Sequence, residues 1–135
     1  RAGISPVTVF ALVQSLIDSS RLHGVTGGTH SAALAHGGHI IVLREDIGRH
    51  NAIDMLGGYA LIQEIDCSDK CIVRTGRVSL EIVNKVWNLG IPILISLSVP
   101  TTAAIHMSLE AGITLIGSVR NGKMNVYCHE WRVII

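Results

Sequence analysis

The residues best suited to chemistry are concentrated in the stretch "REDIGRHN" (44–51), which joins an apolar strand pattern to an apolar helix pattern. Arg49 offers a planar charged fork that suits phosphate or carboxylate, and it precedes a helix, whose N-terminus favours anions. His50 can change its charge near neutral pH. Glu45 and Asp46 would orient the arginine. The stretch therefore predicts anion binding, and the alternative is a capped helix with solvated ion pairs that contribute little.

A glycine pair lies in "TGGTH" (26–30), between the first helix pattern and the first strand pattern. Gly27 and Gly28 carry no Cβ, so their backbone N–H groups can approach a ligand closely. His30 stands beside them. The simpler interpretation is a helix-to-strand turn followed by a half-buried histidine.

Two hydroxyl-bearing loops and one basic turn complete the candidates. "TGRVS" (75–79) and "SVPTT" (98–102) are typical of loops that cap a following helix. "RNGK" (120–123) places Arg120 and Lys123 around a tight turn, which suits a phosphate. A solvated hairpin explains that turn equally well.

Metal-dependent deamination is disfavoured by the motifs. A zinc deaminase needs HxE on a helix and PCxxC for its remaining ligands, but no glutamate stands two positions after His30 and no PCxxC occurs. The three cysteines, Cys67, Cys71 and Cys128, match no standard zinc set or disulfide framework. We therefore expect no zinc.

We expect a cytoplasmic protein, because the three cysteines resemble no disulfide framework and no stretch resembles a signal peptide. A net charge of +1 and 4% aromatic residues give no reason to expect nucleic acid as a partner. No apolar run approaches the roughly 20 residues of a membrane helix. The 48% hydrophobic content exceeds what one small core needs, which suggests a homodimer. The sequence begins with Arg1 rather than Met, and we expect it to be a piece of a longer protein.

Hydrophobic periodicity predicts one α/β domain over residues 1–135, with a mixed sheet between helices on both faces, a three-layer α/β/α sandwich. The expected order is α, β, β, α, β, α, β, α, β, β. Strands are expected at 30–35, 39–45, 71–75, 91–96, 113–119 and 123–128, and helices after Ser5, Arg49, Ser79 and either Ser98 or Thr101. The stripes expected to be buried include Val9, Leu12, Val13, Leu16 and Ile17; Ile53, Leu56, Gly57, Ala60 and Leu61; and Leu80, Val83 and Trp87.

Several of these stretches together resemble a known family. In chain order they are "TGGTHSAALA", "REDIGRHNAID", "GRVSLEIVNK", "GIPILISLSVPTT" and "AGITLIGSVRNGKMNVY". They resemble the C-terminal domain of the formate dehydrogenase accessory protein FdhD, a family of sulfur carriers and sulfurtransferases. The resemblance runs from about Val25 to Tyr127.

The resemblance implies a cytidine deaminase-like fold and a role in formate dehydrogenase maturation. In that role, sulfur from a cysteine desulfurase passes to molybdenum bis-guanylyl-molybdopterin before the cofactor enters the apo-enzyme. The family's cofactor-contacting segment corresponds here to Ser118, Val119, Arg120, Asn121, Gly122 and Lys123. We further expect Arg49 and His50 to face the anionic cofactor, beside a wall formed by Gly27, Gly28 and His30.

The chain departs from the family pattern in its thiols. The family's sulfur-carrying CxxC lies upstream of the matched region, and no CxxC occurs in this sequence. None of the three cysteines falls in a family motif, so we assign none of them as the persulfide carrier and name no catalytic residue. The alternative function is a nucleotide- or cofactor-binding module without catalysis.

Overall fold

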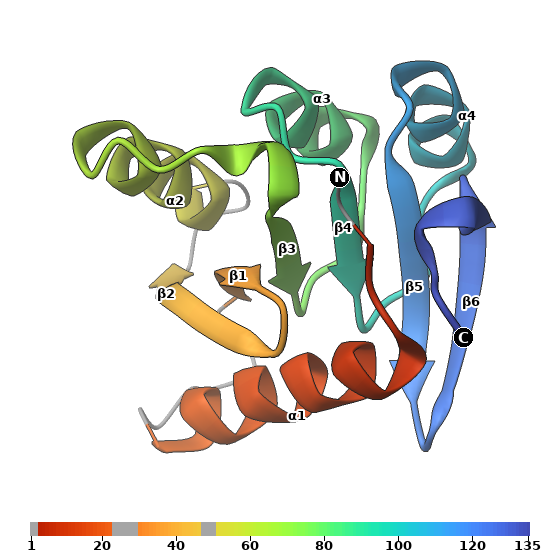
Figure 1. The fold of residues 1–135 in the computed structure, drawn as a ribbon, viewed down its shortest axis with the longest axis horizontal. Helices are drawn as coiled ribbons and strands as arrows, with labels where there is room; N and C mark the ends of the chain where they lie inside the picture. Colours follow the sequence, from red (N-terminus) through yellow and green to blue (C-terminus); the bar gives the residue numbers. More distant parts are fainter. Residues whose placement is uncertain (1–2, 23–29, 47–50) are drawn as a thin grey trace.

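The order of helices and strands agrees with the sequence prediction. The computed structural model describes residues 3–22, 30–46 and 51–135 (Figure 1). The helices are α1 (Pro6–Leu22), α2 (Asn51–Ile62), α3 (Leu80–Asn88) and α4 (Thr102–Ala111). The strands are β1 (His30–His36), β2 (His39–Asp46), β3 (Cys71–Arg74), β4 (Ile93–Ser96), β5 (Thr114–Arg120) and β6 (Lys123–Cys128). Two short 3-10 helices, η1 (Cys67–Asp69) and η2 (Glu130–Arg132), precede β3 and follow β6.

Within the described ranges, six strands form one mixed sheet in the order β2-β1-β3-β4-β5-β6. β3, β4 and β5 run parallel, whereas β1, β2 and β6 join as antiparallel neighbours. Ala32 pairs with Arg74, so the beginning of β1 lies beside the end of β3. One edge of the sheet, which we call the carboxyl edge, therefore gathers the ends of β2, β3 and β4, the start of β1 and the β5–β6 turn.

Helices cover both faces of the sheet, as a three-layer α/β/α sandwich requires. α1 packs on one face, and α2, α3 and α4 stand in a row over the other (Figure 1). In the central strands, Ile72 and Leu94 face the row of three helices, whereas Val73 and Ile95 face α1. All four side chains are fully buried, which is typical of parallel strands between two helix layers.

Side-chain caps position the helices that follow β3 and β4. The Ser79 hydroxyl accepts a hydrogen bond from the Ile82 N–H at 3.4 Å, and the Thr101 hydroxyl accepts one from the Ala104 N–H at 3.1 Å. Each satisfies a backbone donor that the helix leaves unpaired. Gly112 ends α4 in the left-handed conformation, with φ of 77°, where glycine carries no Cβ penalty. Of the two caps expected for α4, Thr101 is therefore the one used.

Two of the predicted helix stripes are wrong in part. Leu61 in α2 is 80% exposed, and Leu80 and Trp87 in α3 are 47% and 51% exposed. α3 instead buries Ile82, Val83 and Val86. Apolar residues occur on more than one side of both helices, so the periodicity offers competing faces and packing against the sheet selects one of them.

The two leucines of α2 provide a matched test of this arrangement. Leu56 is 1% exposed and packs in the core below α2, whereas Leu61 is 80% exposed. Leu56→Ala should lower the free energy of unfolding by about 2–5 kcal/mol. Leu61→Ala should change it by less than about 0.5 kcal/mol. Urea unfolding measures both, and equal losses would contradict the helix orientation.

Candidate functional site

The loops after β3 and β4 are tied together by serine hydroxyls at the carboxyl edge. The Ser96 hydroxyl donates to the Gly76 carbonyl at 2.9 Å, and the Ser98 hydroxyl donates to the Thr75 carbonyl at 3.0 Å. Ser96 is fully buried. These bonds satisfy carbonyls that would otherwise be unpaired, and they hold the β3–α3 loop in one conformation.

The same network continues to β1 and β2. The Ser31 N–H donates to the Thr75 hydroxyl at 3.1 Å, and the Ser31 hydroxyl donates to Glu45 at 3.1 Å. His30 is the first residue of β1, and its imidazole lies close to Gly76. A Cβ atom added to Gly76 would lie only 3.0 Å from Nδ1 of His30. The structure thus brings His30 next to the "TGRVS" loop, from which it is separated by more than forty positions in the sequence.

The charged stretch "REDIGRHN" is described only in part. The Arg44 guanidinium lies 5.5 Å from the centre of the Tyr59 ring, and Glu45 accepts from Ser31. Four residues expected to bind the cofactor lie outside the described residues: Gly27, Gly28, Arg49 and His50. Their assignment as a cofactor-facing group therefore stays a prediction.

A cavity of about 600 Å³ opens beside the β5–β6 turn, on the α1 face of the sheet. Its lining comes from α1, from the residue after β4 and from the turn: Phe10, Val13, Gln14, Ile17, Leu97, Val119, Arg120, Asn121 and Gly122. Asn121 and Gly122 have φ of 53° and 72°, the two-residue hairpin geometry expected from Asn-Gly. This turn brings Arg120 and Asn121 into the lining of a largely apolar cavity.

Two residues of the expected cofactor segment lie apart from this lining. The Ser118 hydroxyl hydrogen-bonds the Tyr127 hydroxyl at 3.1 Å, and its N–H donates to the Ser98 carbonyl at 3.1 Å. Lys123 is exposed at the start of β6. The segment 118–123 is thus divided between a structural part and a part that faces the cavity.

The lining suits a planar heterocycle with an anionic tail. Phe10 and aliphatic side chains offer apolar contact, Gln14 and Asn121 offer amide donors and acceptors, and Arg120 offers a guanidinium. The volume falls within the roughly 300–1,000 Å³ of small-molecule sites. The sequence did not predict Phe10 and Gln14 as lining residues, because their contribution depends on α1 lying across the ends of β4 and β5.

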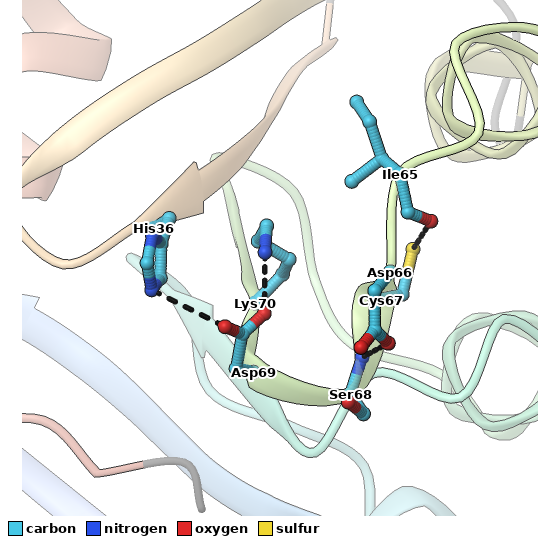
Figure 2. Close-up of polar contacts among 7 residues, drawn as sticks. All are labelled: His36, Ile65, Asp66, Cys67, Ser68, Asp69 and Lys70. Carbon is cyan, nitrogen blue, oxygen red and sulfur yellow. Dashed lines mark hydrogen bonds and ion pairs between the residues drawn. The ribbon is translucent and has the colours of Figure 1, made fainter.

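The three cysteines lie at the opposite edge of the sheet. Cys71 begins β3, Cys128 ends the antiparallel β6, and Cys67 lies in η1 just before β3. Figure 2 shows the Cys67 thiol directed at the Ile65 carbonyl, with which it forms a 3.9 Å hydrogen bond.

The surroundings of these thiols favour the neutral form. Burial raises the pKa of Cys67 and Cys128, and it raises the pKa of Cys71 to about 12. The nearby Lys70 pairs with Asp69, which also meets His36 at 3.4 Å (Figure 2). Among the described residues, no three His, Cys, Asp or Glu side chains form a group that could hold a metal ion.

The sequence model of the FdhD/NarQ family matches residues 1–134. The chain belongs to the FdhD/NarQ family. It is 46% identical over 124 residues to the sulfur carrier protein FdhD of Geobacillus kaustophilus (strain HTA426), covering 92% of this chain and 47% of that protein. It is 45% identical over 130 residues to the FdhD of Bacillus subtilis (strain 168), covering 96% and 50%. The chain thus spans about half the length of these relatives.

Solved structures confirm the fold expected from the family. A protein assigned as a formate dehydrogenase accessory protein from Desulfotalea psychrophila has a TM-score of 0.89 and 27% identity, covering 98% of this chain and 57% of that one. The dCMP deaminase of the cyanophage S-TIM5 has a TM-score of 0.62 and 11% identity, covering 84% of this chain and 99% of that one. The second likeness shows the deaminase-like fold alone.

The raised thiol pKa values predict how fast the three cysteines are alkylated at different pH values. Because a raised pKa lowers the thiolate fraction, all three thiols should react more slowly with iodoacetamide at pH 7.5 in the folded chain than in urea. The rate at Cys67, the most exposed of the three, should still be rising as the pH passes 9. Mass spectrometry of each peptide measures the rates. A thiol alkylated rapidly at pH 7 would contradict this description.

Proposed function

We propose that this chain provides the cofactor-binding part of a sulfur carrier in formate dehydrogenase maturation. The ligand is molybdenum bis-guanylyl-molybdopterin, held at its guanylyl end by the cavity beside the β5–β6 turn. Membership of the FdhD/NarQ family supports the maturation role. The observation that carries the binding site is that Arg120, Asn121 and Gly122, from the segment the family resemblance assigns to the cofactor, line a cavity of suitable size.

The chemistry of the lining explains how a guanylyl group would be held. Its ring would lie against Phe10 and the aliphatic side chains, since aromatic contact suits a flat purine. The amides of Gln14 and Asn121 match the mixed donors and acceptors of the guanine edge. Arg120 would pair with a phosphate. The bound cofactor would supply the molybdenum centre that receives sulfur.

Sulfur delivery requires a reactive thiolate near the bound cofactor. The three cysteines of this sequence lie at the opposite edge, and burial raises their pKa values. The proposal therefore assigns the persulfide-carrying CxxC to a part of the protein outside these 135 residues. A cysteine desulfurase loads it, and apo formate dehydrogenase receives the finished cofactor.

The proposal also includes a cellular location and an oligomeric state. No helix among the described residues is long and apolar enough to cross a membrane, and a cytoplasmic location is proposed from the family role. A homodimer is proposed from the exposed apolar residues, such as Leu61 and Ile62, which are 80% and 77% exposed. Sedimentation velocity tests the dimer, and a single monomeric species at micromolar concentration would contradict it.

Calorimetric titration of the chain with GDP tests the cavity as the guanylyl site. GDP should bind saturably, and Arg120→Ala should weaken it about 10- to 100-fold, because a charge-assisted hydrogen bond to phosphate is lost. Lys123→Ala should have a smaller effect, since Lys123 does not line the cavity.

The matched control is Lys85→Ala, which also removes one positive charge. Lys85 belongs to α3 on the other face of the sheet and pairs with Asp54 at 2.8 Å. The Lys85→Ala variant should bind GDP with the same affinity as the unchanged chain. Equal weakening by Lys85→Ala and Arg120→Ala would show a general charge effect and contradict the site, as would the absence of GDP binding by the unchanged chain.

A further inference from the structure

The last residue of β3 is a buried arginine. Arg74 is only 5% exposed, and its alternation with Ile72 places its side chain on the face covered by α2, α3 and α4. Burying a charged group is costly unless a partner compensates it. A buried guanidinium in the middle of the sheet therefore calls for an acceptor.

The described residues provide no such acceptor. Nε of Arg74 is buried and forms no hydrogen bond, and no carboxylate in the described part of the chain forms an ion pair with its guanidinium. Burial lowers the pKa of Arg74 to about 10, so the guanidinium stays protonated at neutral pH. The result is a buried cation whose Nε–H donor has no partner among the described residues.

The carbonyls of Arg74, Thr75 and Gly76 each accept a hydrogen bond from a donor other than the Arg74 guanidinium. The Gly76 carbonyl accepts from the Ser96 hydroxyl, and the Thr75 carbonyl accepts from the Ser98 hydroxyl. The carbonyl of Arg74 itself accepts from the Leu97 N–H at 3.2 Å. These bonds hold the loop in place while leaving the guanidinium donors free of it.

Gly76 lies close to both the Arg74 guanidinium and the His30 imidazole. A Cβ on Gly76 would clash with Nη2 of Arg74 and would lie 3.0 Å from Nδ1 of His30. Nη2 of Arg74 and Nδ1 of His30 therefore both lie beside Gly76, within reach of a single ligand group. An oxyanion bound next to Gly76 can accept a hydrogen bond from the Arg74 guanidinium and, when Nδ1 carries the proton, a second one from His30.

We propose that Arg74 and His30 form an oxyanion-binding site at the carboxyl edge, on the face covered by α2, α3 and α4. The ligand is a phosphate or carboxylate group, since a planar guanidinium pairs with either through two parallel hydrogen bonds. The site lies across the sheet from the cavity lined by Arg120, so it is distinct from the proposed guanylyl site and does not rest on it.

The direct test follows the Nε–H resonance of Arg74 by NMR of the ¹⁵N-labelled chain. Inorganic phosphate and acetate are titrated separately at constant ionic strength, with chloride as the balancing anion. Saturable movement of this resonance with phosphate alone identifies a phosphate site, and movement with acetate alone identifies a carboxylate site. Two results would overturn the proposal. The first is that the resonance moves with neither phosphate nor acetate, and the second is that it moves equally when sodium chloride alone is titrated.

Thermal unfolding gives an independent readout. Phosphate or acetate at ten times its Kd should raise the Tm of the unchanged chain by about 4 °C relative to chloride. Arg74→Met should abolish that rise. The matched control is Arg77→Met, which removes an exposed arginine from the same loop and should preserve it.

Two results would contradict the site in this experiment. The first is an equal rise in Tm for Arg74→Met and the unchanged chain. The second is an Arg74→Met variant that is strongly destabilised in chloride, because a variant that merely removes an uncompensated buried charge should be at least as stable as the parent. The Arg74 resonance reports this site alone, so its failure remains distinguishable from failure of GDP binding at Arg120.

Discussion

Burial of the parallel strands β3 and β4 between two helix layers is the constraint on which the rest of the structure depends. Every residue of both strands is buried, including Arg74 and Ser96 at their ends. An interior of this kind has no room for ligand chemistry along the strands. Polar groups must gather where the strands end, and the parallel direction puts three loop-forming ends at one edge.

The two edges of the sheet consequently have different chemistry. At the carboxyl edge, His30, Arg74 and the turn with Arg120 can donate hydrogen bonds to anions, and the serine network holds the neighbouring loops in place. The opposite edge, where β3, β4 and β5 begin and which we call the amino edge, carries the cysteines, whose thiol pKa values are raised. In the proposed function this separation assigns anion and cofactor binding to the described domain and sulfur chemistry to another part of the protein.

Local sequence signals were sufficient to predict most of the architecture. Ser79 and Thr101 as helix caps, Asn-Gly in the last hairpin and the buried strand patterns each depend on residues close together in the chain. The buried sides of α2 and α3 were predicted less well, because Leu61 and Trp87 fit a helical stripe that packing against the sheet does not select.

The candidate sites depended on contacts between distant segments, and this limited their prediction. The basic turn was found because it is local, but its cavity needs Phe10 and Gln14 from α1, more than a hundred positions away. Arg74 was missed because a charged residue after "CIV" is typical of a strand reaching solvent. Arg74 is buried only because the neighbouring strands and the helices over the sheet cover β3.

The most direct test of the cavity as the nucleotide site is an amide NMR titration of the labelled chain with GDP. GDP should cause saturable shifts at Gln14, Leu97, Asn121 and Gly122, which line the cavity from three separate segments. Amides at the amino edge, such as Cys71 and Cys128, should not move. Shifts confined to that edge or to a second pocket, which lies between α2 and α3 and is lined by residues such as Gly58, Leu61 and Lys85, would contradict GDP binding in this cavity. The absence of shifts at millimolar GDP would contradict it as well.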